Sequence, residues 1–276
     1  MGPSAIRYAG LGERLEALGH RCRDRGNVSA PIRETAEPGD PRARYLGAIR
    51  SACEEVARRV AETVREGRFP LVLGGDHSVA LGTLGGLAAV HGPGAVLWID
   101  AHGDLNTPET SPSGNVHGMP LAAALGLAGA GFESEAWPLP AVEATQTVLI
   151  GGRSFDDGER ALVRERGLTV FTMTELDSRG VEPIVRGALE QVAGARFVHL
   201  SLDMDAIDPD IAPGVGTPVR GGLSYREAHL AMELIAEADV LDSLELVEVN
   251  PILDHENETA QLAVELAASA LGARIL

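Results

Sequence analysis

Short apolar runs alternate with longer helical patterns along most of the chain, and this alternation constrains the fold more than any other feature. Near-continuous apolar strands separated by helices are typical of a mostly parallel sheet that helices cover on both faces. The runs that predict strands are Phe69–Leu73, Ala95–Ile99, Thr147–Ile150, Leu168–Phe171, Phe197–Leu202 and Leu244–Val249. The patterns between them predict helices near Arg42–Glu66, Ser78–Val90, His117–Leu127, Asp157–Glu165, Val181–Val192, Ser224–Ala238 and Asn257–Leu271. We therefore expect an α/β fold in which residues 1–276 form a single three-layer αβα domain.

The part of the chain ahead of the first run carries weaker signals. We expect a helix over Pro3–Leu18, a weak strand near Gly26–Val28, and a loop over Glu34–Asp40, where Pro and Gly interrupt a polar stretch. Further along, Ser224 and Glu227 have the spacing of a capping box, which predicts that a helix begins there.

Charge and cysteine content exclude several classes of protein. The formal net charge is −17 at pH 7, and the chain contains Arg but no Lys. An acidic surface of this size argues against nucleic acid or an anionic membrane as a partner. No apolar run approaches the roughly 18 residues of a transmembrane helix, and no secretory signal is visible. The two cysteines, Cys22 and Cys53, cannot make a disulfide framework, so we expect a cytoplasmic protein.

Polar side chains follow the predicted strands at the points where the strands end. They are His77 after the first run, Asp100, His102 and Asp104 after the second, Arg153 and Asp156 after the third, Asp203 and Asp205 at the fifth, and Glu248 and Asn250 at the last. Ligands of open α/β sheets bind outside the carboxyl ends of the strands. Five strands therefore direct polar side chains towards one edge of the sheet.

The spacing of these residues indicates a metal centre. Asp-x-His-x-Asp over residues 100–104 and Asp-x-Asp over residues 203–205 have period two, which places their side chains on one side of each strand end. Four carboxylates and two histidines would then meet, and the carboxylates would repel one another without cations. Six ligand side chains suit two ions that share carboxylates better than one catalytic ion. Mixed imidazole and carboxylate ligands favour Mn²⁺, with Fe²⁺, Co²⁺ or Zn²⁺ as alternatives.

Each part of the pattern has a simpler interpretation when it stands alone. A single Asp-x-Asp is more often a turn or a cap, and a single histidine at a strand–helix junction is more often structural. The coincidence at three strand ends favours the metal centre, and we interpret the chain as a two-metal hydrolase. We expect the histidines without such a context to be structural or at the surface: His20, His91, His199, His229 and His255.

These motifs resemble those of the ureohydrolases and, within them, the arginase family. The matching stretches are Gly74–Ser78 (GGDHS), Asp100–Asp104 (DAHGD), Ser201–Asp205 (SLDMD), Gly216–Pro218 with Gly221–Leu223, and Val247–Pro251 (VEVNP). They occur in order over the length of the chain. The segment from Asp104 to Gly118 looks like the arginase form of a loop that is shorter and different in agmatinase-like members. The resemblance implies an arginase-like fold and hydrolysis of L-arginine to L-ornithine and urea by a hydroxide that bridges two Mn²⁺ ions per subunit.

The resemblance also implies a role for each matching residue. His77, Asp100, Asp104 and Asp203 would hold one manganese ion, and Asp100, His102, Asp203 and Asp205 would hold the other. His117 matches a mobile acid–base histidine, Glu248 matches the carboxylate that pairs with the guanidinium, and Asp104 would also accept a hydrogen bond from the hydroxide. Asn106, Ser113, Asn115, Asp156 and Glu159 match positions that recognise the α-carboxylate and α-amino groups, and Thr217 would line the guanidinium pocket. The family implies a homotrimer or a homohexamer.

The chain departs from the family pattern at two places. Family members usually have a strand ahead of a segment like Met1–Arg7, so we expect the sheet to lack one interior strand. Ser154 stands where arginases often have Asp, which weakens the role of nearby Glu159. The alternatives are an agmatinase or guanidinobutyrase of the same fold, and a non-catalytic binding protein. The presence of all six metal ligands, His117 and Glu248 argues against the second.

Overall fold

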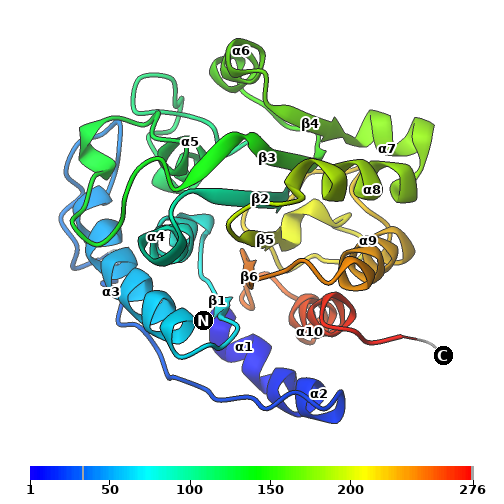
Figure 1. The fold of residues 1–276 in the computed structure, drawn as a ribbon. Coiled ribbons are helices and arrows are strands. Elements are labelled where there is room, and N and C mark those ends of the chain that lie inside the picture. The colour runs from blue at the N-terminus through cyan, green and yellow to red at the C-terminus, as the bar shows by residue number, and fades with distance from the viewer. Residues whose placement is uncertain (33, 275–276) are drawn as a thin grey trace.

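A parallel six-stranded sheet forms the centre of the molecule in a computed structural model that describes residues 1–32 and 34–274 (Figure 1). The strand order is β1-β6-β5-β2-β3-β4, and every neighbouring pair is parallel. The strands are β1 (Leu71–Leu73), β2 (Gly94–Ile99), β3 (Val142–Gly152), β4 (Thr169–Thr172), β5 (Val198–Asp203) and β6 (Ser243–Val247). Each of these overlaps one predicted apolar run, so the predicted parallel α/β fold is confirmed.

The helices follow the predicted pattern with a few differences. They are α1 (Gly2–Tyr8), α2 (Leu11–Ala17), α3 (Leu46–Arg65), α4 (Ala80–His91), α5 (Pro120–Ala124), α6 (Asp157–Arg166), α7 (Met173–Arg179), α8 (Val181–Val192), α9 (Tyr225–Ala238) and α10 (Glu258–Ala270). The described residues also include short 3-10 turns, which are η1 (His77–Val79), η2 (Val116–Gly118), η3 (Ala130–Phe132) and η4 (Met204–Ala206). Residues 3–18 form two helices rather than one, because Gly10 adopts a left-handed φ of 87° between them. Helix α9 has the predicted cap, since the Ser224 side chain accepts from the backbone N–H of Glu227.

Helices cover both faces of the sheet and complete the three layers (Figure 1). Side chains of α1, α2 and α7–α10 pack with Leu97, Leu200 and Leu244 on one face, and side chains of α3–α6 pack with Val96 and Trp98 on the other. Strands β2, β5 and β6 are buried along their whole lengths. Burial on both faces explains why these strands read as continuous apolar runs in the sequence.

Helices α3 and α4 approach each other closely, which fixes the position of the turn that carries His77. A Cβ atom on Gly82 would lie 2.6 Å from the Cys53 carbonyl oxygen, and one on Gly86 would lie 2.5 Å from the Ala57 carbonyl oxygen. Larger residues at either position would push the helices apart. Because α4 begins directly after η1, this contact anchors η1 against the end of β1.

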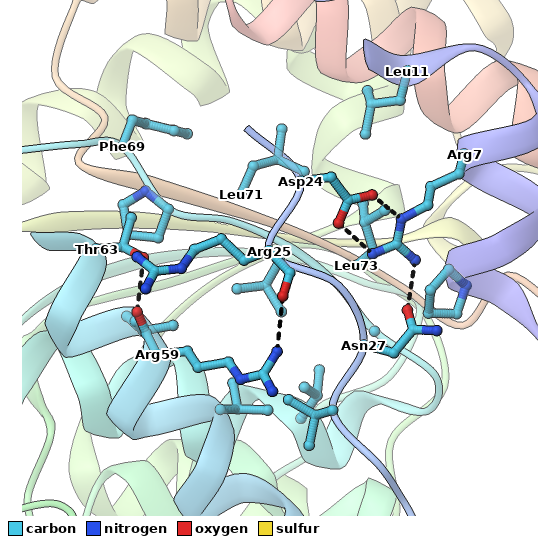
Figure 2. A pocket seen from close by; sticks show the side chains of 18 of the residues that line it. Arg7, Leu11, Asp24, Arg25, Asn27, Arg59, Thr63, Phe69, Leu71 and Leu73 are labelled. Carbon is cyan, nitrogen blue, oxygen red and sulfur yellow. Dashed lines mark hydrogen bonds and ion pairs between the residues drawn. The ribbon is translucent and has the colours of Figure 1, made fainter. Parts of the chain in front are cut away.

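A cleft of 1340 Å³ borders the free edge of β1 (Figure 2). Residues 23–28 also line it, and they are held by Arg7, whose Nε lies 2.6 Å from Oδ2 of Asp24, and by Arg59, which donates to the Arg25 carbonyl oxygen at 3.1 Å. The weak strand predicted near Gly26–Val28 is wrong, because no backbone hydrogen bond joins this segment to β1 across the cleft. Strand β1 therefore forms an edge of the sheet, and the expected lack of an interior strand stays a prediction. In the described ranges, no helix combines the length and apolar character needed to cross a membrane.

Candidate metal centre and substrate site

Four neighbouring strands bring the predicted metal ligands and Glu248 to one edge of the sheet. His77 follows β1, Asp203 and Asp205 lie at the end of β5, and Asp100 begins the segment after β2. Glu248 follows β6, which lies between β1 and β5. The side chains surround a cavity of 130 Å³. The predicted convergence at the carboxyl ends of the strands is therefore present in the structure.

Most of the predicted site residues line this cavity. They are His77, His102, Asp104, Asn106, Ser113, His117, Asp156, Glu159, Asp203, Asp205, Thr217 and Glu248. Asp100 does not line the cavity and is almost completely buried. Asn115 does not line the cavity, because its carboxamide oxygen accepts a hydrogen bond from Arg44 at 2.8 Å. Sequence reasoning missed Ser111 and Gly118, which also line it and belong to the same loop.

The first group of potential ligands surrounds Nδ1 of His77. This nitrogen lies 3.0 Å from Oδ2 of Asp100, 3.1 Å from Oδ2 of Asp104 and 3.1 Å from Oδ2 of Asp203. Ligand bonds of about 2.1 Å at right angles would separate neighbouring ligand atoms by about 3.0 Å. Each of the three oxygens therefore lies at the distance from Nδ1 of His77 that two neighbouring ligand atoms around one cation would have.

The second group lies on the other side of Asp100. Nδ1 of His102 is 3.0 Å from Oδ2 of Asp205 and 3.5 Å from Oδ1 of Asp100. Asp100 belongs to both groups through its two oxygens, as a bridging carboxylate would. Asp203 contacts only the first group, and its Oδ1 accepts from the backbone N–H of Asp205 at 2.7 Å. Thr217 supports the second group by donating to Oδ2 of Asp205 at 3.0 Å.

Burial and mutual repulsion perturb the carboxylates. Burial, followed by the charge of Asp100, raises the pKa of Asp104 to about 7. Burial and the charge of Asp205 raise the pKa of Asp203, and burial with the charge of Asp100 raises that of Asp205. Burial opposes a charge on His102, but its hydrogen bonds to Asp100 and Asp205 raise its pKa to about 11. The cluster therefore favours positive charge at its centre.

One buried atom decides whether metal ions fit this cluster. Within the described residues, Nδ1 of His77 has no hydrogen-bond partner of acceptable geometry, although three carboxylate oxygens surround it. A lone pair that faces three anionic oxygens is unfavourable unless a cation lies between them. Two imidazoles and four carboxylates form a donor set suited to divalent first-row ions. The residues present therefore fit a centre of two cations.

The rest of the His77 ring is held in place by buried neighbours. The ring stacks on Trp98 with centroids 4.0 Å apart and planes within 8°, and Nε1 of Trp98 donates to Oδ2 of Asp100 at 3.0 Å. On its other side, Nε2 of His77 lies 2.7 Å from Oγ of Ser201, which donates to Oε1 of Glu245 at 2.7 Å. Partners of this kind orient the imidazole of a metal ligand.

Sequence reasoning missed Glu245, which is fully buried inside β6. Its Oε1 lies 3.3 Å from Nε2 of His199, and Nδ1 of His199 lies 2.7 Å from Oγ of Ser243. The strand register pairs His199 with Ser243 and Ser201 with Glu245. The expected structural role of His199 agrees with this position. The signal that could have revealed Glu245 is a carboxylate within an otherwise apolar buried strand.

Two non-glycine residues of the site adopt left-handed backbone conformations. Asp104 has a φ of 52° and Glu248 has a φ of 64°. Such conformations are uncommon outside glycine and cluster at functional sites, where the surrounding contacts hold them. The Asp104 carbonyl oxygen accepts from the first turn of α5, and the Glu248 backbone N–H donates to the Gly75 carbonyl oxygen at 2.8 Å.

Glu248 and His117 face each other across the cavity. Oε1 of Glu248 accepts from the backbone N–H of His77 at 2.8 Å and lies 3.6 Å from Nδ1 of His117. The nearby carboxylate of Glu248 raises the pKa of His117 to about 8, against the opposing effect of burial. A histidine in this range can both give and accept a proton near neutrality.

The predicted substrate residues beside α6 are engaged with one another. Asn106 donates to Oδ2 of Asp156 at 2.7 Å. Glu159 accepts from the backbone N–H of Asp156 at 2.8 Å and from that of Leu105 at 3.0 Å. Both oxygens of Glu159 thus bind backbone groups, and its carboxylate joins the start of α6 to the loop after β2.

Arg153 is directed away from the cavity chemistry. Its guanidinium donates to the carbonyl oxygens of Val219 at 2.6 Å, Asp205 at 2.8 Å and Ala206 at 3.1 Å. Burial lowers its pKa. Arg153 therefore holds the two ends of the segment from Asp205 to Val219 together and does not line the cavity.

Known proteins with the same arrangement can be identified over the full length of the chain. The model of the Arginase family matches residues 1–272. The chain is 49% identical to arginase of Bacillus subtilis over 276 residues, and 50% identical to arginase of Bacillus caldovelox over 281 residues. In both cases the match covers all of this chain and 93% of the relative.

Solved structures agree with the sequence comparison. The native structure of Bacillus caldovelox arginase at pH 5.6 matches with a TM-score of 0.97 at 50% identity, over all of this chain and 93% of that one. Entamoeba histolytica arginase in complex with L-ornithine matches with a TM-score of 0.90 at 30% identity, over 99% of this chain and 91% of that one. On its sequence, its fold and the residues gathered at the ends of its strands, the chain belongs to the arginase family.

Proposed function

We propose that this protein hydrolyses the guanidinium group of L-arginine to give L-ornithine and urea, with two Mn²⁺ ions as its cofactor. The observation that carries the proposal is the pair of ligand groups that share Asp100, with the unpartnered Nδ1 of His77 among three carboxylates. Membership of the arginase family supports the same reaction.

The six predicted ligands would hold the two ions. His77, Asp100, Asp104 and Asp203 would hold one, and Asp100, His102, Asp203 and Asp205 would hold the other; the short distances around His77 and around His102 support this assignment. When bound, such ions make water acidic enough to supply hydroxide at neutral pH. Imidazole and carboxylate ligands favour Mn²⁺ among the available metals.

The cavity selects and orients a cation. Glu248, with its carboxylate mostly buried beside the ligand groups, would pair with the guanidinium and hold its carbon towards the metal centre. Asp104 can accept a hydrogen bond from the attacking water as well as bind metal. Thr217, which contacts Asp205, would line the same part of the cavity.

Hydrolysis adds water across the bond between the guanidinium carbon and the nitrogen of the ornithine chain. That C–N bond breaks, the carbon leaves as urea, and the departing nitrogen must gain a proton. His117 is the residue in position to supply it, since its ring faces Glu248 at the cavity wall and its pKa is about 8. The loop with Asn106, Ser113, Asn115, Asp156 and Glu159 would recognise the α-carboxylate and α-amino groups.

The test is urea release from L-arginine by the Mn²⁺-loaded protein, compared with agmatine, which lacks the carboxylate. We expect a kcat/KM for arginine at least a hundred-fold above that for agmatine. Equal or greater activity on agmatine would overturn arginine as the substrate, and no urea from any guanidino compound would overturn the reaction. Comparing Mn²⁺ with Co²⁺, Fe²⁺ and Zn²⁺ in the same assay tests the metal.

We further propose a cytoplasmic homotrimer or homohexamer. The strongly exposed Ile252 and Leu253 after β6 support a contact between subunits. Light scattering on the purified protein measures the mass; a monomer of 28.9 kDa would contradict the proposal.

A further inference from the structure

Arg44, just ahead of α3, holds the substrate loop from behind. Its backbone N–H donates to the Gly114 carbonyl oxygen at 2.9 Å, and its Nη2 donates to the Ser113 carbonyl oxygen at 2.6 Å and to Oδ1 of Asn115 at 2.8 Å. Gly114 fits closely against the same segment, since a Cβ atom there would lie 2.0 Å from the Pro41 carbonyl oxygen. The loop and the segment before α3 therefore form one packed unit.

The contact with Arg44 fixes which end of the Asn115 carboxamide remains free. A guanidinium only donates hydrogen bonds, so the atom that faces it must be the amide oxygen. The NH₂ group of Asn115 is the end left for another partner. Ser113 is placed in a similar way, because its Oγ accepts from the backbone N–H of Asn115 at 3.1 Å and keeps its own hydrogen to donate.

Ser113 lines the cavity and Asn115 lies next to it in the loop, and these two donors contrast with the rest of the lining, which is acidic. Asp104, Asp156, Glu159 and Glu248 all line the cavity, and a carboxylate on a ligand would be repelled by them. The part-buried Arg44 supplies a positive charge directly behind the two donors. Its Nε is buried and, in the ranges that the structure describes, makes no hydrogen bond, so part of its charge is left uncompensated.

We propose that Arg44 is a positioning and specificity-determining residue for the α-carboxylate of the substrate: it turns the Asn115 carboxamide so that only donors face that group, and it supplies the balancing charge. The inference rests on the proposed function, because it concerns the carboxylate that distinguishes arginine from agmatine. Polarisation of the amide by the guanidinium strengthens the N–H donors at its other end.

The sharpest test compares two ligands that differ only in the carboxylate. L-ornithine carries it and putrescine does not, so calorimetric titration of the Mn²⁺-loaded protein with each isolates the contribution of the carboxylate. Arg44→Met removes the charge and keeps the apolar stem, and Arg44→Lys keeps a charge without the planar fork. Arg50→Met is the matched control, because Arg50 lies on α3, is exposed, and donates to the Gly131 carbonyl oxygen outside the cavity.

We expect Arg44→Met to weaken L-ornithine binding on the order of ten-fold or more, the usual size of a charge-assisted hydrogen bond, and to leave putrescine binding unchanged. Urea assays should show the same split, with a raised KM for L-arginine and an unchanged kcat/KM for agmatine. Arg44→Lys should bind L-ornithine with an affinity between those of Arg44→Met and the unaltered protein, and Arg50→Met should match the unaltered protein. Should Arg44→Met fail to fold, Asn115→Asp provides a second test, since it replaces the donor by an acceptor and should weaken L-ornithine alone.

Equal losses for L-ornithine and putrescine would overturn the inference, as would no loss for either, because both outcomes remove the link to the carboxylate. These results differ from a failure of the proposed function. In that case the unaltered protein itself would release no urea from L-arginine.

Discussion

Nε2 of His77 lies 2.7 Å from Oγ of Ser201, and this contact determines the tautomer of the imidazole. Ser201 donates its own hydrogen to Glu245, so its oxygen must accept from the ring. The proton of a neutral His77 then resides on Nε2, and Nδ1 turns its lone pair towards Asp100, Asp104 and Asp203. The buried serine thus directs the lone pair of a predicted metal ligand towards the carboxylates before any ion binds.

Ser201→Ala is therefore expected to weaken metal binding without removing a ligand. Loss of such a supporting partner lowers affinity by roughly 10- to 100-fold. Titration of the metal-free protein with Mn²⁺, followed by calorimetry, measures the change independently of activity. Ser243→Ala is the matched control, because this buried serine contacts His199 instead. Equal effects of both substitutions would mean that the loss is one of core packing alone.

Loss of a predicted metal ligand should reduce the number of bound ions, whereas loss of the supporting Ser201 should only weaken their binding. His102→Ala and Asp205→Ala each remove a side chain from the second group, so we expect the bound metal to fall from about two ions per chain towards one, with loss of most urea release. Elemental analysis after dialysis gives the stoichiometry. His255→Ala, at an exposed site, should retain both ions. Full activity at unchanged metal content in the two ligand variants would refute the two-metal centre.

Local sequence patterns predicted the sheet and the gathering of the candidate metal ligands, because both depend on neighbours along the chain. Apolar runs indicate buried strands wherever they lie, and the period-two spacing of Asp100, His102 and Asp104 indicates a shared side regardless of the rest of the fold. Glu245 and Ser201 could not be assigned in this way. Their contact depends on the register between β5 and β6, which are far apart in sequence.

The same limitation explains the errors. The segment near Gly26–Val28 was predicted as a weak strand, but a strand requires a backbone partner, and no backbone hydrogen bond joins this segment to β1 across the cleft. Asn115 does not line the cavity, because the structure turns its carboxamide oxygen to Arg44, 71 residues earlier in the chain, and its part in recognising the substrate, directly or through water, stays a prediction. Interactions between distant segments decided both cases.

Metal-free protein should lose stability as the pH rises, and bound metal should abolish that loss. Folding raises the pKa of Asp104 to about 7 and that of His102 to about 11. A group whose pKa is higher in the folded state stabilises the fold fully at pH values below its unfolded pKa. This stabilisation is lost as the pH rises through the folded pKa, so the two groups together lower the stability between about pH 4 and 11. We expect the Tm of metal-free protein to fall between pH 5 and 8. A hundred-fold excess of Mn²⁺ over its Kd should add about 2.7 kcal/mol for each bound ion, or roughly 5–10 °C per ion. A Tm that changes neither with pH nor with added Mn²⁺ would contradict this interpretation of the cluster.

His117 should titrate above its ordinary range because of Glu248. Nδ1 of His117 lies 3.6 Å from Oε1 of Glu248, and this contact raises its pKa to about 8. The proton is held below that value and lost as the pH rises through it, so a role as proton donor predicts that urea release declines on the alkaline side. Proton NMR of the imidazole in metal-free protein measures the pKa directly. Glu248→Gln should return it towards 6.5, since the amide keeps the shape of the side chain but removes its charge. Bound cations should lower the pKa of His117 by repulsion, which a second NMR titration with diamagnetic Zn²⁺ in place of Mn²⁺ would measure against the metal-free protein. A pKa that stays near 8 in Glu248→Gln would assign the shift to other groups and separate His117 from Glu248 in the proposed reaction.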